Sequence, residues 1–308
     1  MVEIINGIQQ IGIGVCDVKE VFNWYRKHLG FDILLFEDEA VASLMTQYTN
    51  DKAERREAYL ALNMIGGGGL EIWQFKDRQP RAPRVPIEFG DLGIYAMKIR
   101  CNNLTEIHSY LRGLKVSDLS DINQSFCPNF YFTDPFGNRV QMVEDHYVFC
   151  KQPSNNGGVL GAVIGVCDME RSLEFYGTML DYSIIEYDNI EAFKGAGKGR
   201  FRRVVIKQER KQFGGFGDLL GPSQVLDSTP NKIFENRLWG DLGYIHLCFD
   251  VSGMCFIRDK AKKNNYAFTV DSANSFDMGD AAGHFSYMED PDGTLIELVE
   301  THKVPILK

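Results

Sequence analysis

The chain has 308 residues, 44% of them hydrophobic, which is enough material for two domains with cores of their own. Its formal net charge of -9 argues against a nucleic-acid-binding surface, and no apolar run reaches the roughly 18 residues of a membrane span. The expected partner is therefore a small-molecule substrate, with no nucleic acid and no membrane, and the expected state is a monomer or a homodimer.

The seven cysteines are scattered along the chain and form no Cys-x-x-Cys pair. An odd, scattered set of this kind is typical of reduced thiols. The first residues also lack the charged and apolar regions of a secretion signal. Together these features predict a cytoplasmic protein.

The first predicted elements are a strand, a helix and three further strands. The apolar run 10–15 predicts the opening strand, and Asp17 with Glu20 forms a capping-box-like start for a helix. Alternating and β-branched runs then predict three strands, over residues 32–36, 58–62 and 70–75.

The same order of elements continues along the chain. The next unit is predicted to contain a strand over 93–100, a helix over 104–114 and strands over 129–133 and 139–144. Another strand over 161–166 leads into a helix capped by Asp168. The last unit is predicted to contain a strand over 243–251, a helix over 252–263 and strands over 285–288 and 294–299.

Short motifs recur at matching places in these units. Gly-Val-Cys-Asp at 14–17 returns at 165–168, and Asp-Leu-Gly at 91–93 returns at 241–243. Asp-Pro-x-Gly starts at Asp134 and again at Asp290. The repetition indicates four related βαβββ modules.

The modules divide into two pairs. Residues 1–149 hold modules at about 5–77 and 90–147, and residues 159–308 hold modules at about 159–210 and 241–302. The stretch 150–158, rich in Pro, Ser, Asn and Gly, is the predicted linker. The long connection 212–240 is expected to cover a pocket.

Paired βαβββ modules, a strand that ends in a helix-capping Asp before an aromatic pair, and Asp-Pro-x-Gly before a last strand resemble the vicinal oxygen chelate superfamily. That superfamily includes glyoxalases, extradiol dioxygenases and bleomycin resistance proteins. The resemblance implies an α+β fold, in which the four modules form two cupped mixed-sheet barrels of the glyoxalase/extradiol dioxygenase type.

The resemblance also implies where metal ligands stand, on the first and last strands of the modules. Seven residues before the capping Asp stand Gln10 and Gly161, and at the first strand after Asp-Leu-Gly stand Ala96 and His246. The last strands carry Gln141 and Glu297, seven residues after the Asp of Asp-Pro-x-Gly. The last strand of the first module offers Glu71, whose counterpart in the third module is expected near residues 217–218.

Two pairings of modules follow from these positions. If each half forms its own cavity, neither cavity holds a full ligand set. If the first module pairs with the fourth, one cavity holds Gln10, Glu71, His246 and Glu297. The other cavity then holds Ala96, Gln141 and Gly161, which do not form a metal site.

The four residues of the first cavity resemble the ligand set of glyoxalase I in its fused, monomeric form. The cofactor implied is a divalent metal ion, Zn, Ni, Co, Mn or Fe. The implied reaction is that of a lyase or isomerase, in which a proton next to a carbonyl is removed and a metal-stabilised enediolate forms. Glu297 is the first candidate for the base and Glu71 the second.

Other functions and other roles for these residues stay open. An extradiol dioxygenase needs two His and one carboxylate around iron, and a metal-free binding protein of the bleomycin-resistance type needs only aromatic walls. His246 also fits a buried core position, and Glu297 a solvated strand face. A slip of one residue would turn Gln9 inward in place of Gln10. His284 is a candidate pocket residue.

Overall fold

The computed structural model describes residues 3–124, 126–192, 199–208, 219–272, 276–278 and 281–303. These residues form an α+β fold with two large, curled mixed sheets. None of the described helices combines the length and the apolar composition that a membrane crossing requires.

The first sheet, called sheet A, has nine strands and joins the two ends of the chain. Its order is β13-β15-β16-β12-β1-β4-β3-β2, and β14 pairs with β15 outside this path. The strands are β1 (Ile4–Gly14), β2 (Ile33–Val41), β3 (Arg55–Leu62), β4 (Gly69–Phe75), β12 (Gly243–Ser252), β13 (Val270–Asp271), β14 (Phe276–Met278), β15 (Ala281–Glu289) and β16 (Leu295–Lys303).

The second sheet, called sheet B, has seven strands from the middle of the chain, in the order β6-β7-β5-β8-β11-β10-β9. The strands are β5 (Gly93–Cys101), β6 (Asn129–Thr133), β7 (Arg139–Glu144), β8 (Asn156–Gly165), β9 (Ile184–Ala192), β10 (Arg200–Lys207) and β11 (Leu219–Val225).

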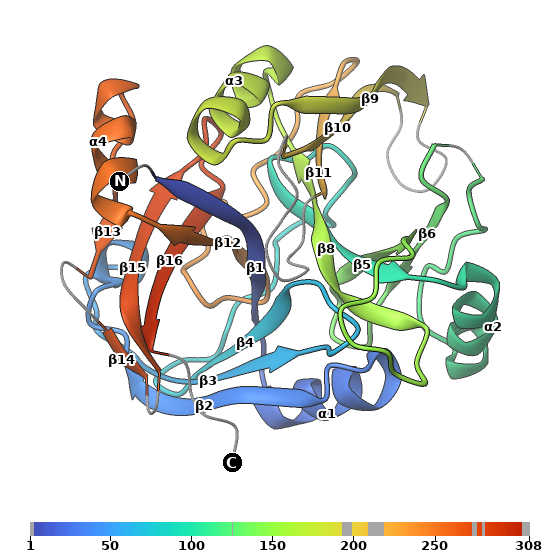
Figure 1. The fold of residues 1–308 in the computed structure, drawn as a ribbon, viewed down its shortest axis with the longest axis horizontal. Helices are drawn as coiled ribbons and strands as arrows, with labels where there is room; N and C mark the ends of the chain where they lie inside the picture. The colour runs from blue at the N-terminus through green and yellow to red at the C-terminus, as the bar shows by residue number, and fades with distance from the viewer. Residues whose placement is uncertain are drawn as a thin grey trace.

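The sheets pair the first module with the fourth and the second with the third. In sheet A, β1 lies antiparallel to β12, so segments from opposite ends of the chain are neighbours. Figure 1 shows this as the blue strand β1 beside the orange strand β12. In sheet B, β5 lies antiparallel to β8 in the same way. Each sheet is therefore built from two modules, one from each half of the chain.

Four α-helices follow the first strands of the modules: α1 (Val18–Leu29), α2 (Leu104–Leu114), α3 (Met169–Leu180) and α4 (Met254–Lys263). The Asp17 carboxylate accepts hydrogen bonds from the backbone N–H groups of Lys19 and Glu20 at the start of α1, each at 2.9 Å. Asp168 accepts one from Arg171 at the start of α3. These caps satisfy N–H groups that have no partner inside the helix.

Each sheet has two apolar faces, which belong to different clusters of buried side chains. One face belongs to the main core, which includes residues of all four helices, such as Tyr25, Leu111, Phe175 and Ile257. The opposite face of sheet A carries a second cluster around Trp73 and Tyr287, and that of sheet B a third around Tyr131. These second faces are the concave surfaces, called cup A and cup B below.

The repeated Tyr and Asp motifs contact each other between modules. The Tyr25 hydroxyl on α1 donates to Asp134 at 2.7 Å, and the Tyr176 hydroxyl on α3 donates to Asp290 at 2.8 Å. All four side chains are buried, and burial raises the pKa of both carboxyls. The hydrogen bonds join consecutive modules, so each half of the chain is tied together although its strands lie in different sheets.

Some predicted boundaries differ from those in the structure. Strand β8 begins at Asn156, inside the stretch taken as a linker, because Gly158 and Val159 exchange backbone hydrogen bonds with Gly66 and Gly68. Within the long connection 212–240, residues 212–218 lie outside the described residues and 219–225 form β11. Residues 226–242 then return to sheet A and carry Trp239 into the apolar cluster of cup A.

Candidate metal centre

Strand β1 turns its two glutamines toward cup A. Ile8 and Ile11 both belong to the main core on the other face, although they are three residues apart. The spacing is odd because a β-bulge lies between Ile8 and Gln10, where two residues of β1 oppose one of β12. Gln9 and Gln10 therefore both lie on the cup side. Gln10 is buried and Gln9 is half-buried.

His246 enters cup A from the neighbouring strand β12. It lies opposite Gly12 in the register of β1 with β12, and its ring is fully buried. A Cβ on Gly12 would lie 2.4 Å from Cε1 of this ring, which no side chain tolerates. The glycine thus provides the space that the imidazole occupies.

Two carboxylates flank the imidazole. Oε2 of Glu71, on β4, and Oε2 of Glu297, on β16, each lie 3.1 Å from Nε2 of His246. A ring nitrogen carries at most one hydrogen, and the hydrogen bond goes to Glu71. Oε2 of Glu297 is left buried without a hydrogen-bond partner.

This donor set fits a divalent cation. The ligand atoms of Glu71, His246 and Glu297 lie within 4.8 Å of one another, and all three side chains are buried. Buried charges are stable when they are paired or bind metals, and one proton cannot serve two carboxylates. Gln10 faces the same side of the sheet and offers a neutral oxygen.

Tyr287, on β15, fixes the orientation of the histidine. Its hydroxyl lies 3.0 Å from Nδ1 of His246, the nitrogen that faces away from the carboxylates. A partner at one ring nitrogen fixes the tautomer and orientation of the imidazole, and so leaves the other nitrogen available to a metal; such partners raise the affinity of metal sites. Tyr287 is fully buried and pairs with Glu297 in the register of β15 with β16.

The charges of the centre shift one another's proton affinity. Burial raises the pKa of Glu297 to about 7; the His246 charge opposes this rise and the Glu71 charge adds to it. Burial lowers the pKa of His246, but the charges of Glu297 and Glu71 outweigh burial and the pKa lies above its usual value. A carboxyl that titrates near neutral pH is suited to accept and return a proton.

Cys248 is a further residue of this centre that the motifs do not identify. It lies two residues after His246 on β12, on the same face, and opposite Glu297 in the register of β12 with β16. Burial raises the pKa of its thiol far above the usual value, and the Glu297 and Glu71 charges add to the effect. The thiol is thus held neutral beside the carboxylates. Strand alternation from His246 is the signal that would have found it.

Aromatic side chains form the wall of cup A. The ring of Trp239 lies 4.9 Å from that of Trp73 and 5.6 Å from that of Phe75, between ring centres. Trp73 lies two residues from Glu71 on the same face of β4. The wall therefore adjoins the candidate ligands directly.

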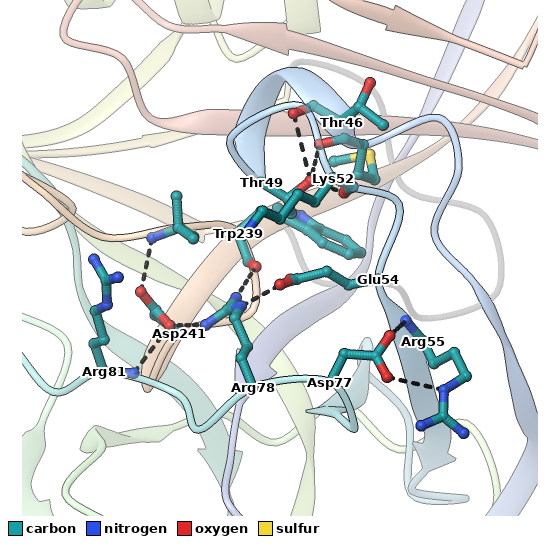
Figure 2. A network of polar contacts seen from close by, with 12 residues as sticks. Thr46, Thr49, Lys52, Glu54, Arg55, Asp77, Arg78, Arg81, Trp239 and Asp241 are labelled. Carbon is teal, nitrogen blue, oxygen red and sulfur yellow. Dashed lines mark hydrogen bonds and ion pairs between the residues drawn. The ribbon is translucent and has the colours of Figure 1, made fainter.

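A buried polar network holds Trp239 in place (Figure 2). The Arg78 guanidinium donates to Glu54 at 2.8 Å, to the carbonyl of Trp239 at 2.6 Å, and to the fully buried Asp241. The same guanidinium stacks over the ring of Phe75. The connection from the third module to the fourth is thereby fastened to the first module, over cup A.

Cup B carries the counterparts of all four candidate ligands, and they are different residues. Register places Ala96 at the position of His246 and Gln141 at that of Glu297. Gly161 occupies the position of Gln10. The strand partner of Gly161 is Leu219 and that of Gln10 is Gly69, so Leu219 corresponds to Gly69. It follows that Gly221 is the counterpart of Glu71. The expected position at 217–218 was therefore wrong, and those two residues lie outside the described part of the chain.

A lysine occupies part of the space that these small residues leave. Lys98, the counterpart of Cys248, is buried, and its Nζ lies 2.8 Å from where a Cβ on Gly221 would be. A buried ammonium at this place opposes the binding of a second cation. The two cups share a backbone plan but differ in charge.

His284 lies away from cup A. It sits on β15 three residues before Tyr287, on the opposite face, where its Nε2 lies 2.6 Å from Asp271. The residue is buried against this acidic partner, on the face of β15 opposite to Tyr287. It is therefore not a residue of this pocket.

Comparison with known families agrees with this architecture. Residues 7–142 match the family model described as the Glyoxalase/Bleomycin resistance protein/Dioxygenase superfamily. The match covers the first pair of modules, where it agrees with the resemblance to the vicinal oxygen chelate superfamily. The other modules carry the same motifs and the same strand order. A search of curated proteins by sequence gave no match.

Solved structures have the same fold over nearly the whole chain. A putative dioxygenase from Bacillus subtilis superposes with a TM-score of 0.66 at 13% identity, covering 97% of this chain and 86% of that one. Glyoxalase I from Zea mays gives a TM-score of 0.58 at 10% identity, covering 96% and 92%. At these identities the likeness establishes the fold of this chain and not its reaction.

Proposed function

We propose that the protein is a metal-dependent lyase or isomerase that removes a proton next to a substrate carbonyl. The observation that carries this proposal is the pair of carboxylates, Glu71 and Glu297, at equal distances of 3.1 Å from a single ring nitrogen of His246. Gln10, Glu71, His246 and Glu297 would hold the ion. Zn, Ni, Co, Mn and Fe all suit a set of oxygens and one imidazole.

A divalent ion bound there would supply a Lewis acid that polarises a substrate carbonyl and stabilises the negative charge left by proton removal. The protein's own residues would do the rest. Glu297 would accept the proton, because burial raises its pKa to about 7, and would return it to the neighbouring carbon. Glu71 is the second candidate for the base.

The surrounding residues support this assignment. Tyr287 holds His246 through Nδ1, which leaves Nε2 directed at the carboxylates. The wall of Trp73, Phe75 and Trp239 excludes water, and charge interactions are stronger in a dry site.

Ring cleavage by an extradiol dioxygenase is less well supported. That chemistry uses two His and one carboxylate around iron. Cup A has one His among its candidate ligands, with Gln10 where a second would stand, and cup B has Gly161 there. A metal-free binding protein is also less well supported, since it would leave Oε2 of Glu297 buried without a hydrogen bond.

Metal content is the first test. We expect the purified protein to contain or take up a first-row metal ion, measured by inductively coupled plasma mass spectrometry after dialysis. His246→Ala should lose that ion, and Ala96→Gly, at the corresponding position of cup B, should keep it. Full metal occupancy in His246→Ala would contradict the proposed centre.

The reaction class is tested by hydrogen exchange. The metal-loaded protein is incubated in D₂O with α-hydroxyketones and with thiol adducts of 2-oxoaldehydes, and proton NMR follows exchange next to the carbonyl. Exchange should require the metal and should be lost in Glu297→Gln. Consumption of dioxygen with catechols, in place of exchange, would favour the dioxygenase.

A further inference from the structure

A separate cavity lies where sheet A meets the start of strand β5. It has a volume of about 380 Å³ and is lined by segments from three modules, including Leu92, Tyr48 and Thr294. None of the four candidate metal ligands lines it. Trp239, Ile245 and Leu295 belong both to its wall and to the apolar cluster of cup A. The cavity is therefore a neighbour of the proposed metal centre, with a shared partition.

Arg237 contributes a buried positive charge to the wall of this cavity. The residue is 9% exposed, and its guanidinium donates to the backbone carbonyls of Ile233 and Leu242. Within the described part of the chain it forms no ion pair. A guanidinium has five N–H groups, so the three hydrogen bonds leave donors available. Burial lowers the pKa of Arg237 to about 10, which reflects the poor compensation of its charge.

Of the acidic groups that line the cavity or act on Arg237, Glu235 is exposed to solvent and the others are engaged elsewhere. Asp241, whose charge acts on Arg237, is bound by Arg78 (Figure 2). On the cavity wall, Glu289 accepts the hydroxyl of Tyr48, and Asp292 accepts the backbone N–H of Cys167. A buried charge without a counter-ion is costly, and a ligand that supplies the counter-ion relieves that cost.

We propose that this cavity binds a small organic carboxylate through Arg237. A planar guanidinium suits the two oxygens of a carboxylate. The carboxylates of Glu235, Glu289 and Asp292 on the same wall disfavour a doubly charged phosphate. The Arg237 guanidinium lies over the ring of Phe234, and the Trp239 ring and Leu238 on the same wall favour an apolar or aromatic body on the ligand. The inference does not depend on the proposed reaction, because the cavity and the metal centre share no ligand.

Benzoate is the carboxylate used to test this site, and benzamide, which has the same ring but no charge, is its control. Isothermal titration calorimetry at constant ionic strength should give saturable binding of benzoate at one site and little binding of benzamide. Inorganic phosphate is the third arm. Phosphate binding as tight as that of benzoate would overturn the choice of a carboxylate, and heat from added salt alone, without saturation, would overturn the site.

Three variants locate the binding. Arg237→Met should weaken benzoate binding at least about tenfold, as expected for loss of a charge-assisted hydrogen bond. Because Arg237 also braces its own loop, Leu238→Trp offers an independent test: it fills the cavity and leaves the arginine. Arg202→Met, which removes an arginine paired with Glu170 and Asp188 outside the cavity, is the control.

The outcomes are distinct. Loss of binding in both Arg237→Met and Leu238→Trp, with Arg202→Met unchanged, supports the site. Benzoate binding that survives both cavity variants would overturn it, as would the absence of binding to the unaltered protein. Metal content measured on the same samples reports separately on the centre at His246.

Discussion

His246 is the residue around which the charged and hydrogen-bonding groups of the proposed metal centre gather. A ring with no exposure to solvent lies between two carboxylates on one side and a tyrosine hydroxyl on the other. Without a cation, one proton on Nε2 lies between two acids, and Oε2 of Glu297 stays without a hydrogen bond. The geometry favours an occupant of higher positive charge than a proton.

Metal affinity should rise with pH. Metal ligands must lose their protons, and the pKa of Glu297 is raised to about 7 while that of His246 lies above its usual value. Below pH 7 the apparent affinity for Zn²⁺ or Co²⁺ should fall by about tenfold per pH unit for each proton displaced. Competition with a chromophoric chelator at pH 6, 7 and 8 measures this, and a flat profile would contradict it.

Removal of the tyrosine hydroxyl should weaken the site without abolishing it. Tyr287→Phe deletes the partner of His246 Nδ1, and loss of such a partner typically lowers metal affinity by about 10-fold to 100-fold. Tyr59→Phe is the matched control, since the Tyr59 hydroxyl donates to Glu37, outside the centre. Equal affinities of the two variants, in the same chelator assay, would count against the orienting role of Tyr287.

At the scale of elements, the connection between the third and fourth modules depends on Arg78. This one guanidinium binds Glu54 on the first module, Asp241, and the carbonyl of Trp239 (Figure 2). Because Asp241 is fully buried, its charge requires a buried partner. The network thereby fixes both the wall of cup A and the partition toward the Arg237 cavity.

Arg78→Met should destabilise the protein by about 3–5 kcal/mol, the usual cost of leaving a buried charge without its partner. Urea denaturation followed by fluorescence measures it, and Trp239 makes the emission sensitive to this segment. Arg55→Met is the control shown in the same figure, because Arg55 pairs with Asp77 at the surface. Its midpoint should barely change. A similar small change for Arg78→Met would mean that the network contributes little.

At the scale of the whole molecule, cup A and cup B have the same strand order but carry side chains of different charge. Sheet A brings two acids and an imidazole together, whereas sheet B has Ala96, Gly161 and Gly221 at three corresponding positions and a buried Lys98 beside them. The duplicated modules therefore provide one candidate metal centre, and the second cup is available for another task or for stability alone.

The metal stoichiometry should accordingly be one ion per chain. Titration with Co²⁺, followed by its absorption spectrum and by calorimetry, should reach an end point at one equivalent. The small residues and the ammonium of cup B provide no second donor set. A second equivalent bound with similar affinity would show that cup B also takes a cation.

Much of the fold could be predicted from the sequence, because local signals determine its elements. Helix α2 spans Leu104–Leu114 and strand β7 spans Arg139–Glu144, as the periodicity predicts. The capping groups Asp17 and Asp168 act as their spacing implies. These features depend on hydrogen bonds and apolar periods within a few residues, so they are visible in one sequence. The repeats likewise identified which positions in different modules correspond.

The tertiary structure alone decided which modules share a sheet and which side chains meet. Pairing of β1 with β12 is a contact between distant segments, to which local propensity is blind. The bulge that turns Gln10 and Gln9 to the same face arises from such pairing, as does the placement of Cys248 and Tyr287 beside Glu297. A sequence determines its short-range order through neighbouring residues, but a site exists only where the folded chain brings remote charges to a few ångströms.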